Sequence, residues 1–286
     1  MRSKKLKLMV GALLVTMVGA TFVGCGSKGE DNNTASNKDA VTISISGSTS
    51  VGPLMEKVQE KYEEENSNVT LEIQQNGSGA GIKDVVSGIS EIGMSSRELK
   101  DEEKQQVKGT TIAYDGIALL VNPANTVKNI SLEDVKKVYT GEITNWKDLG
   151  GEDTPIVVIS REEGSGTRGA FVEITGVEQK NADGKKEDMT TTSAVISNST
   201  NEVITAVSGD ANAIGYISLG SLNDSVKALK VDGVEATAEN VANGTYSVQR
   251  PFNIATNGEA KGAAADFISY ILSTEGQKII EDNGYI

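Results

Sequence analysis

The chain has 286 residues, with 27 Lys and Arg against 40 Asp and Glu, so its formal net charge is −13 at pH 7. An overall negative field opposes binding to nucleic acid and to anionic membrane surfaces. The sequence contains no histidine, which excludes nucleophilic systems with a histidine base and the usual histidine-containing zinc sites.

Residues 1–24 are predicted to be a secretory signal peptide. Four basic residues open the chain, and residues 8–23 are apolar apart from glycines and two threonines. The apolar run is shorter than a membrane-spanning helix usually requires. The sequence FVGC at 22–25 resembles a bacterial lipobox, which implies that Cys25 is lipidated with several acyl chains and becomes the first mature residue. Cys25 is the only cysteine, so no intrachain disulfide can form.

Residues 25–40 are polar and nearly free of large apolar side chains, so they are predicted to form a flexible tether. Removal of residues 1–24 leaves 23 basic against 40 acidic residues, because four basic and no acidic residues are lost, and the net charge becomes −17. A mature domain of this charge can capture an anion only with fixed donors at short range, where they dominate over the screened long-range field.

Four segments repeat one pattern, a strand that ends in a small polar turn and continues into a helix. The strands are predicted at residues 41–45, 69–75, 92–94 and 156–159. The turns that follow are rich in Gly and Ser, and the helices begin near Pro53, Ile82, Leu99 and Ala170, the third being a charged helix over 99–107. Alternation of strand and helix predicts an α/β fold with mainly parallel sheets, whose ligands lie outside the carboxyl ends of the strands.

Two long extended runs, 111–121 and 246–256, are predicted to cross between two lobes. The predicted boundaries are 41–116 with 249–286 for lobe I, and 117–248 for lobe II. Within lobe II, Ser131 is predicted to cap a helix, Trp146 to be a packing residue, and residues 176–192 to form a polar surface loop. Further strands are expected at 195–199 and 213–218, with helices at 202–208 and 263–272.

The turn at residues 161–168 is the clearest candidate for an anion site. Free backbone N–H groups at a helix start bind anions without a lysine. Ser165 and Thr167 add hydroxyl donors, and Arg161 and Arg168 bracket the turn with guanidinium groups suited to a tetrahedral oxyanion. The roles of Arg168 and of Arg97, in another of the turns, are left open.

The ordered set of turns, GSTSVGP at 47–53, GSG at 77–79, GMSSR at 93–97, YTGEITNW at 139–146 and REEGSGT at 161–167, resembles the phosphate-binding proteins of ATP-driven phosphate importers. The match runs from about residue 41 to the C-terminus. It implies a two-lobed periplasmic-binding-protein fold of type II with the ligand in the cleft between the lobes. It also implies a monomeric, lipid-anchored extracytoplasmic receptor that hands inorganic phosphate to an ABC-type permease, without a cofactor, a metal or enzymatic activity.

The phosphate-binding residues that the resemblance implies come from both lobes: Ser48, Thr49, Ser50, Ser78, Ser95, Ser96, Arg161, Ser165, Gly166 and Thr167. The enterobacterial form has an aspartate where this sequence has Ser96, and that aspartate accepts the proton of a phosphate oxygen. Another carboxylate is therefore expected to take this role, and the candidates are Asp115 at the crossing and Glu163 in the anion turn. A carboxylate acceptor would favour phosphate over sulfate, which has no proton to donate at neutral pH.

Three alternatives follow from the same residues. One is a receptor of the same fold for sulfate, molybdate or another tetrahedral oxyanion, which the serine at position 96 leaves open. A phosphatase with a Ser165 nucleophile is disfavoured, because the sequence has no histidine base, no Gly-x-Ser-x-Gly elbow and no Walker loop. A purely structural surface lipoprotein gives no reason for ordered Gly and Ser turns at strand ends.

Overall fold

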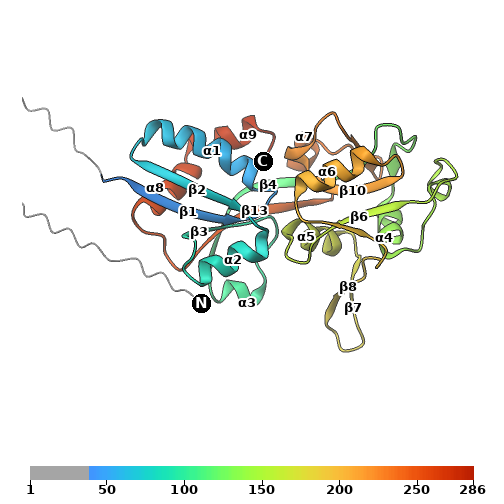
Figure 1. Ribbon diagram of the computed structural model, residues 1–286, viewed down its shortest axis with the longest axis horizontal. Coiled ribbons are helices and arrows are strands. Elements are labelled where there is room, and N and C mark those ends of the chain that lie inside the picture. Colours follow the sequence, from blue (N-terminus) through green and yellow to red (C-terminus); the bar gives the residue numbers. More distant parts are fainter. Residues whose placement is uncertain (1–38) are drawn as a thin grey trace, which may run out of the picture. The chain divides into compact units, whose positions relative to one another are not determined.

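The structure, a computed structural model, describes residues 39–286 (Figure 1). The predicted signal peptide, Cys25 and nearly all of the predicted tether lie outside the described residues. Within residues 39–286, nine strands form one sheet in the order β2-β1-β3-β13-β4-β10-β6-β9, with β11 added on β4. The sheet is mainly parallel within each of two lobes, and helices cover it on both faces.

The first lobe is built on three parallel strands, with β1 between β2 and β3. Its elements are β1 (Val41–Gly47), α1 (Gly52–Glu65), β2 (Val69–Gln75), α2 (Ser78–Val86), β3 (Ile92–Ser95), α3 (Asp101–Lys104), α8 (Gly262–Ile271) and α9 (Thr274–Asp282). Ile43 and Ile45 alternate with serines along β1, so their side chains point to one face of the sheet. There they pack in a buried cluster with side chains of α1, α8 and α9, while α2 covers the opposite face.

The second lobe repeats this arrangement around parallel strands β10, β6 and β9. Its elements are β5 (Asn129–Ile130), α4 (Leu132–Thr140), β6 (Val157–Arg161), α5 (Gly166–Ile174), β7 (Glu178–Lys180), β8 (Lys186–Asp188), β9 (Val195–Ser197), α6 (Thr200–Gly209), β10 (Ala213–Ser218), β11 (Lys227–Ala228), β12 (Lys230–Val231) and α7 (Ala238–Ala242). Side chains of α4 and α5 pack on one face of the sheet and side chains of α6 on the other.

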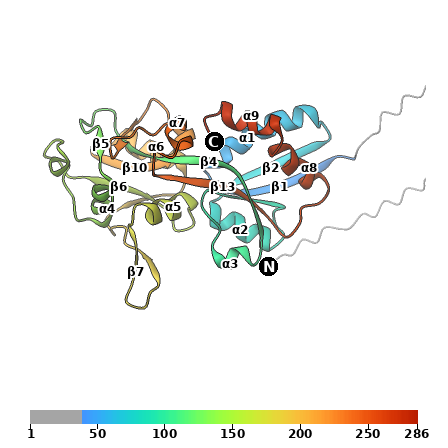
Figure 2. The ribbon, with the colours of Figure 1, turned by 180° about the vertical axis from the view of Figure 1, so that it is seen from behind.

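Two antiparallel strands, β4 (Lys108–Val121) and β13 (Gln249–Thr256), run from one lobe into the other, and Figure 2 shows them side by side at the crossing. In the second half of β4, successive side chains pack against opposite faces of the sheet. Ile117 and Leu119 pack in the cluster that includes α4 and α5, whereas Ala118 and Leu120 pack in the cluster that includes α6. β13 also pairs antiparallel with β3, and β4 with β10 and β11, so every antiparallel pair of this sheet involves one of these two strands.

Several sequence-based predictions are confirmed in detail. The strand at 69–75 has the predicted bounds, and the Ser131 hydroxyl caps α4 by accepting a hydrogen bond from the Asp134 N–H. Trp146 opens a short 3-10 helix (Trp146–Leu149), is 1% exposed, and donates its indole N–H to the Asn212 carbonyl at 2.9 Å. It is a packing residue of the second lobe, as predicted.

Two local predictions are wrong. Residues 176–192 are not simply a loop, because β7 and β8 form an antiparallel hairpin that projects from the second lobe in Figure 1. The charged helix predicted over 99–107 is only the four-residue α3. The predicted segment begins at Leu99 and ends at Val107, and both of these apolar side chains are buried in a cluster with α2. The chain therefore turns inward at both ends of α3 and does not continue as an exposed helix.

Within residues 39–286, no helix combines the length and the apolar character that crossing a membrane requires.

Candidate functional site

The structure brings buried hydroxyl groups from both lobes to one place, at the carboxyl ends of the parallel strands. We call this set the hydroxyl cluster; its members are Ser48, Thr49, Ser50, Ser78, Ser96, Thr167 and Thr200. All seven are buried, and each lies in a turn or helix start that directly follows a strand. This is the edge at which ligands of parallel α/β sheets bind.

Within the first lobe, Ser48 organises the turn between β1 and α1. Its hydroxyl donates to Ser96 Oγ at 2.9 Å and accepts hydrogen bonds from the N–H groups of Ser50 and Val51. Ser78, the first residue of α2, accepts a hydrogen bond from the Ser96 N–H at 3.2 Å. Three successive turns of the first lobe are therefore bonded to one another through serine side chains.

Hydrogen bonds also connect the two lobes at this point. Ser50 Oγ and Thr167 Oγ1 are 2.7 Å apart, and Ser96 Oγ lies 3.5 Å from the same threonine oxygen. Beside them, the Gly79 N–H donates to the Gly164 carbonyl at 3.0 Å. These contacts hold the start of α5 against the starts of α1 and α2.

Gly166 is required by this close approach. A Cβ atom at this position would lie 2.2 Å from Ser78 Oγ and 2.8 Å from Ser96 Oγ. Both distances are far below van der Waals contact, so any side chain would push the two lobes apart or displace the serines. Gly164 lies two residues earlier in the same turn, and a Cβ atom there would have no neighbouring atom of residues 39–286 within 4 Å.

Arg161, the last residue of β6, places a guanidinium group beside the cluster. It is 1% exposed, and its Nη2 donates to Thr49 Oγ1 at 3.1 Å. Its Nε and Nη2 donate to the two carboxylate oxygens of Glu162, at 2.8 and 2.9 Å. Its Nη1 is buried and has no hydrogen-bond partner among residues 39–286. A buried charged donor of this kind is costly unless it is paired, so Nη1 suits an anionic ligand.

An aromatic stack fixes the strand end that carries Arg161. Phe171 and Tyr216 stack with ring centroids 3.9 Å apart, and Tyr139 meets Phe171 edge-on at 4.7 Å. The Tyr216 hydroxyl accepts a hydrogen bond from the Arg161 N–H at 3.3 Å. Burial raises the pKa of the Tyr216 phenol to about 12, so it remains neutral at physiological pH.

The two arginines whose roles were left open are each paired with a carboxylate. Arg97 makes a two-pronged contact with Glu103 at 2.7 and 2.8 Å. Arg168 donates from Nε to Asp188 at 2.7 Å and from Nη1 to the Arg161 carbonyl at 2.8 Å. Arg168 therefore supports the strand end that carries Arg161, and it also ties that strand end to the base of the β7–β8 hairpin.

Two of the expected hydroxyl groups have local roles instead of joining the cluster. The Ser165 hydroxyl caps α5 by accepting from the Arg168 N–H at 3.2 Å, and the Ser95 hydroxyl donates to the Arg97 carbonyl at 3.1 Å. Both side chains are buried, and both stabilise the backbone of the turn in which they lie.

Neither carboxylate that was expected to accept the phosphate proton contacts the cluster. Glu163 is exposed, because the backbone turns between Glu162 and Ser165 and places Glu163 at its tip. Asp115 is buried, but it bonds Arg250 Nη2 at 3.1 Å and lies 3.5 Å from the Gly220 N–H. Burial raises the pKa of the Asp115 carboxyl, and the neighbouring Arg250 charge offsets only part of this rise.

Sequence reasoning missed two residues of the site. Glu162, not Glu163, carries the carboxylate that faces Arg161, and its position depends on the turn geometry, which the sequence EEG does not reveal. Thr200 completes the cluster from the second lobe. A signal for it was present, since the sequence NSTNE after β9 is another small polar turn at a strand end that opens a helix.

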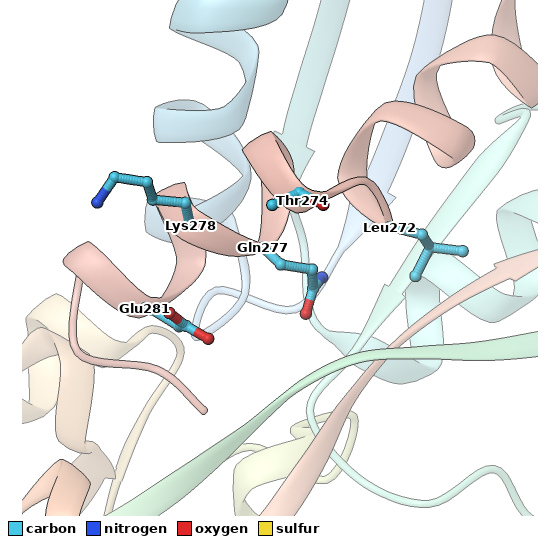
Figure 3. Close-up of a pocket in the computed structure, with 5 residues that line it drawn as sticks. All are labelled: Leu272, Thr274, Gln277, Lys278 and Glu281. Carbon is cyan, nitrogen blue, oxygen red and sulfur yellow. The ribbon is translucent and has the colours of Figure 1, made fainter.

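A metal site is not found among the described residues, and the pocket shown in Figure 3 lies apart from the hydroxyl cluster in the sequence. Within residues 39–286, no group of three or more His, Cys, Asp or Glu side chains is placed to hold a metal ion. A surface pocket at α8 and α9, shown in Figure 3, is lined by five side chains: Leu272, Thr274, Gln277, Lys278 and Glu281. None of them belongs to the hydroxyl cluster.

Hydroxyl groups, helix starts and one guanidinium that converge from two α/β lobes define a two-lobed binding protein. Comparisons with known proteins agree with this class. A family model described as the PBP superfamily domain matches residues 32–275. The phosphate-binding protein PstS of Bacillus subtilis is 36% identical over 297 residues, which cover 100% of this chain and 95% of that protein.

Solved structures extend the comparison. A substrate-binding protein from Clostridium perfringens, solved with bound phosphate, is 51% identical with a TM-score of 0.80, covering 86% of this chain and 98% of that chain. An ABC-type phosphate transport receptor from Vibrio cholerae is 36% identical with a TM-score of 0.70, covering 85% and 99%. The chain belongs to the PBP superfamily and, within it, to the PstS family of phosphate-binding proteins.

Proposed function

We propose that this protein is an extracytoplasmic receptor that binds inorganic phosphate with high affinity and delivers it to an ABC-type import permease. The observation that carries the proposal is the convergence of buried hydroxyl groups from both lobes beside Arg161, which bonds one of them through Nη2 and whose Nη1 has no hydrogen-bond partner within residues 39–286. Membership of the PstS family supports the same ligand class. Ser48, Thr49, Ser50, Ser78, Ser96, Arg161, Gly166 and Thr167 are proposed to bind phosphate.

The balance of charge at the site suits a ligand that must be released again. Glu162 forms an ion pair with Arg161, so uncharged hydroxyl and N–H groups are proposed as the principal donors. Hydrogen bonds to charged groups contribute roughly 1.5–3 kcal/mol each. About ten of them exceed the ~8 kcal/mol of micromolar affinity, and desolvation and lobe closure take the surplus.

Closure of the two lobes around phosphate is part of the proposal. The lobes are taken as 41–116 with 249–286, and 117–248, so that β4 and β13 form the hinge. Their hydrophobic clusters support this division, because Ile112 and Phe252 pack with the first lobe while Ile117 and Val248 pack with the second. Hinge bending at two such strands is a common closing motion.

The position of the protein outside the cell membrane is proposed to depend on its N-terminus. Residues 1–24 direct secretion, Cys25 carries the lipid, and residues 25–40 tether the monomeric domain to the membrane surface. Replacement of Cys25 by Ser is expected to abolish labelling by radioactive palmitate and to release the protein from membranes into the soluble fraction. Unchanged membrane association of this variant would contradict the anchor.

We propose no catalytic role, because the cluster contains neither a general base nor a metal site to activate a nucleophile. A receptor for sulfate or another tetrahedral oxyanion is the alternative. It is favoured by one observation, namely that no carboxylate of residues 39–286 bonds the hydroxyl cluster. Discrimination against sulfate then rests on hydroxyl groups that act as acceptors.

Calorimetric titration of the purified full chain with inorganic phosphate, and then with sulfate in competition, tests the function. We expect phosphate to bind at micromolar concentration or below, and millimolar sulfate to compete weakly. Tighter binding of sulfate than of phosphate would establish the alternative, and binding of neither anion would refute a receptor for tetrahedral anions.

A further inference from the structure

Thr200 belongs to the hydroxyl cluster but lies outside the five turn motifs named from the sequence. It is the first residue of α6, directly after β9, and it is 3% exposed. The helix start is capped without it, because Ser199 Oγ accepts from the Glu202 N–H and Glu202 Oε2 accepts from the Asn198 N–H. The Thr200 side chain is thus not needed to cap its own helix.

The Thr200 hydroxyl instead meets the first lobe. Thr200 Oγ1 donates to the Thr49 carbonyl at 3.3 Å, and lies 3.3 Å from Thr49 Oγ1 and 3.4 Å from Ser50 Oγ. Thr49 and Ser50 precede Thr200 by about 150 residues and belong to the turn before α1. The contact therefore joins α6 of one lobe to the first anion turn of the other.

The hydroxyl protons of Thr49, Ser50 and Thr200 determine which of these groups donates at this contact. Thr49 Oγ1 already accepts a hydrogen bond from Arg161 Nη2, and the Thr200 proton goes to the Thr49 carbonyl. The Thr200 oxygen then remains as an acceptor for the Thr49 or the Ser50 hydroxyl. Thr200 thereby fixes the position of the turn that carries Thr49 and Ser50.

We propose that Thr200 is a positioning residue of the phosphate site, which holds Thr49 and Ser50 in place across the closed lobes and slows the release of phosphate. The proposal rests on the phosphate-receptor function. Because Thr200 and Thr49 lie on different lobes, their contact forms on closure and breaks on opening. Its loss should act on the dissociation rate, while the association rate, which is set before closure, stays nearly constant.

The size of the effect follows from the geometry. The distances of 3.3–3.4 Å exceed the usual 2.7–2.8 Å for hydroxyl donors, so the contribution is that of a modest neutral hydrogen bond. Removal of the hydroxyl should raise the phosphate dissociation rate about fivefold.

The test uses Thr200→Val, which preserves the shape of the side chain and removes its hydroxyl. Thr200→Ser, which keeps the hydroxyl, should restore the wild-type rate. Thr205→Val is the matched control, because Thr205 lies on the same helix with an exposed side chain bonded only within α6. Phosphate association and dissociation rates are measured by stopped flow on the full chain. An unchanged dissociation rate in Thr200→Val, or equal effects in Thr205→Val, would overturn the proposal.

A second measurement does not depend on phosphate binding. Fluorescent labels at Ile89→Cys and Val195→Cys, two exposed positions on different lobes, report the distance between the lobes in a Cys25→Ser background. Without phosphate, Thr200→Val should shift the distance distribution toward longer values, and Thr205→Val should not. If the wild-type chain fails to bind phosphate, the receptor function fails, whereas an unchanged distribution in Thr200→Val removes only the role of Thr200.

Discussion

Arg161 and Arg250 are both almost completely buried, at 1% and 2% exposure, yet their surroundings differ. The carboxylate that faces Arg161 belongs to Glu162, the next residue of the same turn, and the other lobe contributes the Thr49 hydroxyl. The carboxylate that faces Arg250 belongs to Asp115, its direct partner in the register of β4 and β13.

The difference shows how one residue type serves two purposes. The Asp115–Arg250 pair lies within the crossing strands, so the proposed closure of the lobes would leave it intact. Arg161 and Glu162 travel together with the second lobe, and the contact with Thr49 is made across the lobes. The Arg161 guanidinium bonds Thr49, a member of the hydroxyl cluster, whereas Arg250 lies over the Phe252 ring at 5.3 Å. Both arginines keep guanidinium nitrogens without a hydrogen-bond partner within residues 39–286, so the neighbouring hydroxyl cluster, and not an unpaired nitrogen, is the reason to place the anion at Arg161.

The largest expected effect comes from breaking the pair at the crossing. Asp115→Ala leaves the Arg250 charge buried without a carboxylate and should lower the free energy of unfolding by about 3–5 kcal/mol. The double variant Asp115→Ala with Arg250→Met should recover most of this loss, because no unpaired charge remains. Urea denaturation followed by circular dichroism measures both. A loss below about 1 kcal/mol in the single variant would show that the pair is not structural.

Loss of the other arginine should affect binding more than folding. Arg161→Ala removes a charged donor worth roughly 1.5–3 kcal/mol and should weaken phosphate binding by at least about tenfold, as measured by calorimetry. Arg161→Lys keeps the charge but cannot reproduce the fork, so its affinity should be intermediate. Wild-type affinity in Arg161→Ala would mean that phosphate binds elsewhere.

A methyl group at the lobe contact should interfere with closure. Gly166→Ala places a Cβ atom 2.2 Å from Ser78 Oγ, and such overpacking costs typically 1–3 kcal/mol, so phosphate affinity should fall about tenfold. Gly164→Ala is the matched control in the same turn, because nothing lies within 4 Å of its added methyl group. Equal titration curves for the two variants would contradict a site that closes at Gly166.

The smallest effect concerns pH. Burial alone would raise the pKa of Glu103, but hydrogen bonds and charge from Arg97 lower it below the ordinary 4.5. A carboxylate with a depressed pKa in the folded state stabilises the protein above the unfolded pKa, and this contribution is lost as pH falls through the folded pKa. The stability difference between wild type and Glu103→Gln should therefore be present at pH 7 and shrink below about pH 4.5. A difference that does not change with pH would contradict the ion pair.

Much of the fold followed from local patterns in the sequence. Alternation along residues 69–75 and the serine cap at Ser131 were sufficient, because both depend on neighbours within a few positions. The hairpin of β7 and β8 was missed because its polar residues alternate with no apolar face. The site was harder to predict in detail. Glu162 and Glu163 are equivalent in sequence, and only the turn decides which one faces Arg161.

Contacts between residues far apart in the sequence could not be predicted. Asp115 and Arg250 are 135 residues apart, so their direct pairing depends on the register of two strands that the sequence does not specify. The expectation that Asp115 accepts a phosphate proton arose because a buried carboxylate near a crossing looks the same in sequence whether its partner is a ligand or an arginine.

A crystal structure of the full chain grown with inorganic phosphate tests the central claim most directly. The account predicts one phosphate between the lobes, with an oxygen on Arg161 Nη1 and others on the hydroxyl groups of Thr49, Ser78 and Thr167. Phosphate bound at the α8–α9 pocket, with these hydroxyl groups still bonded only to one another, would contradict it.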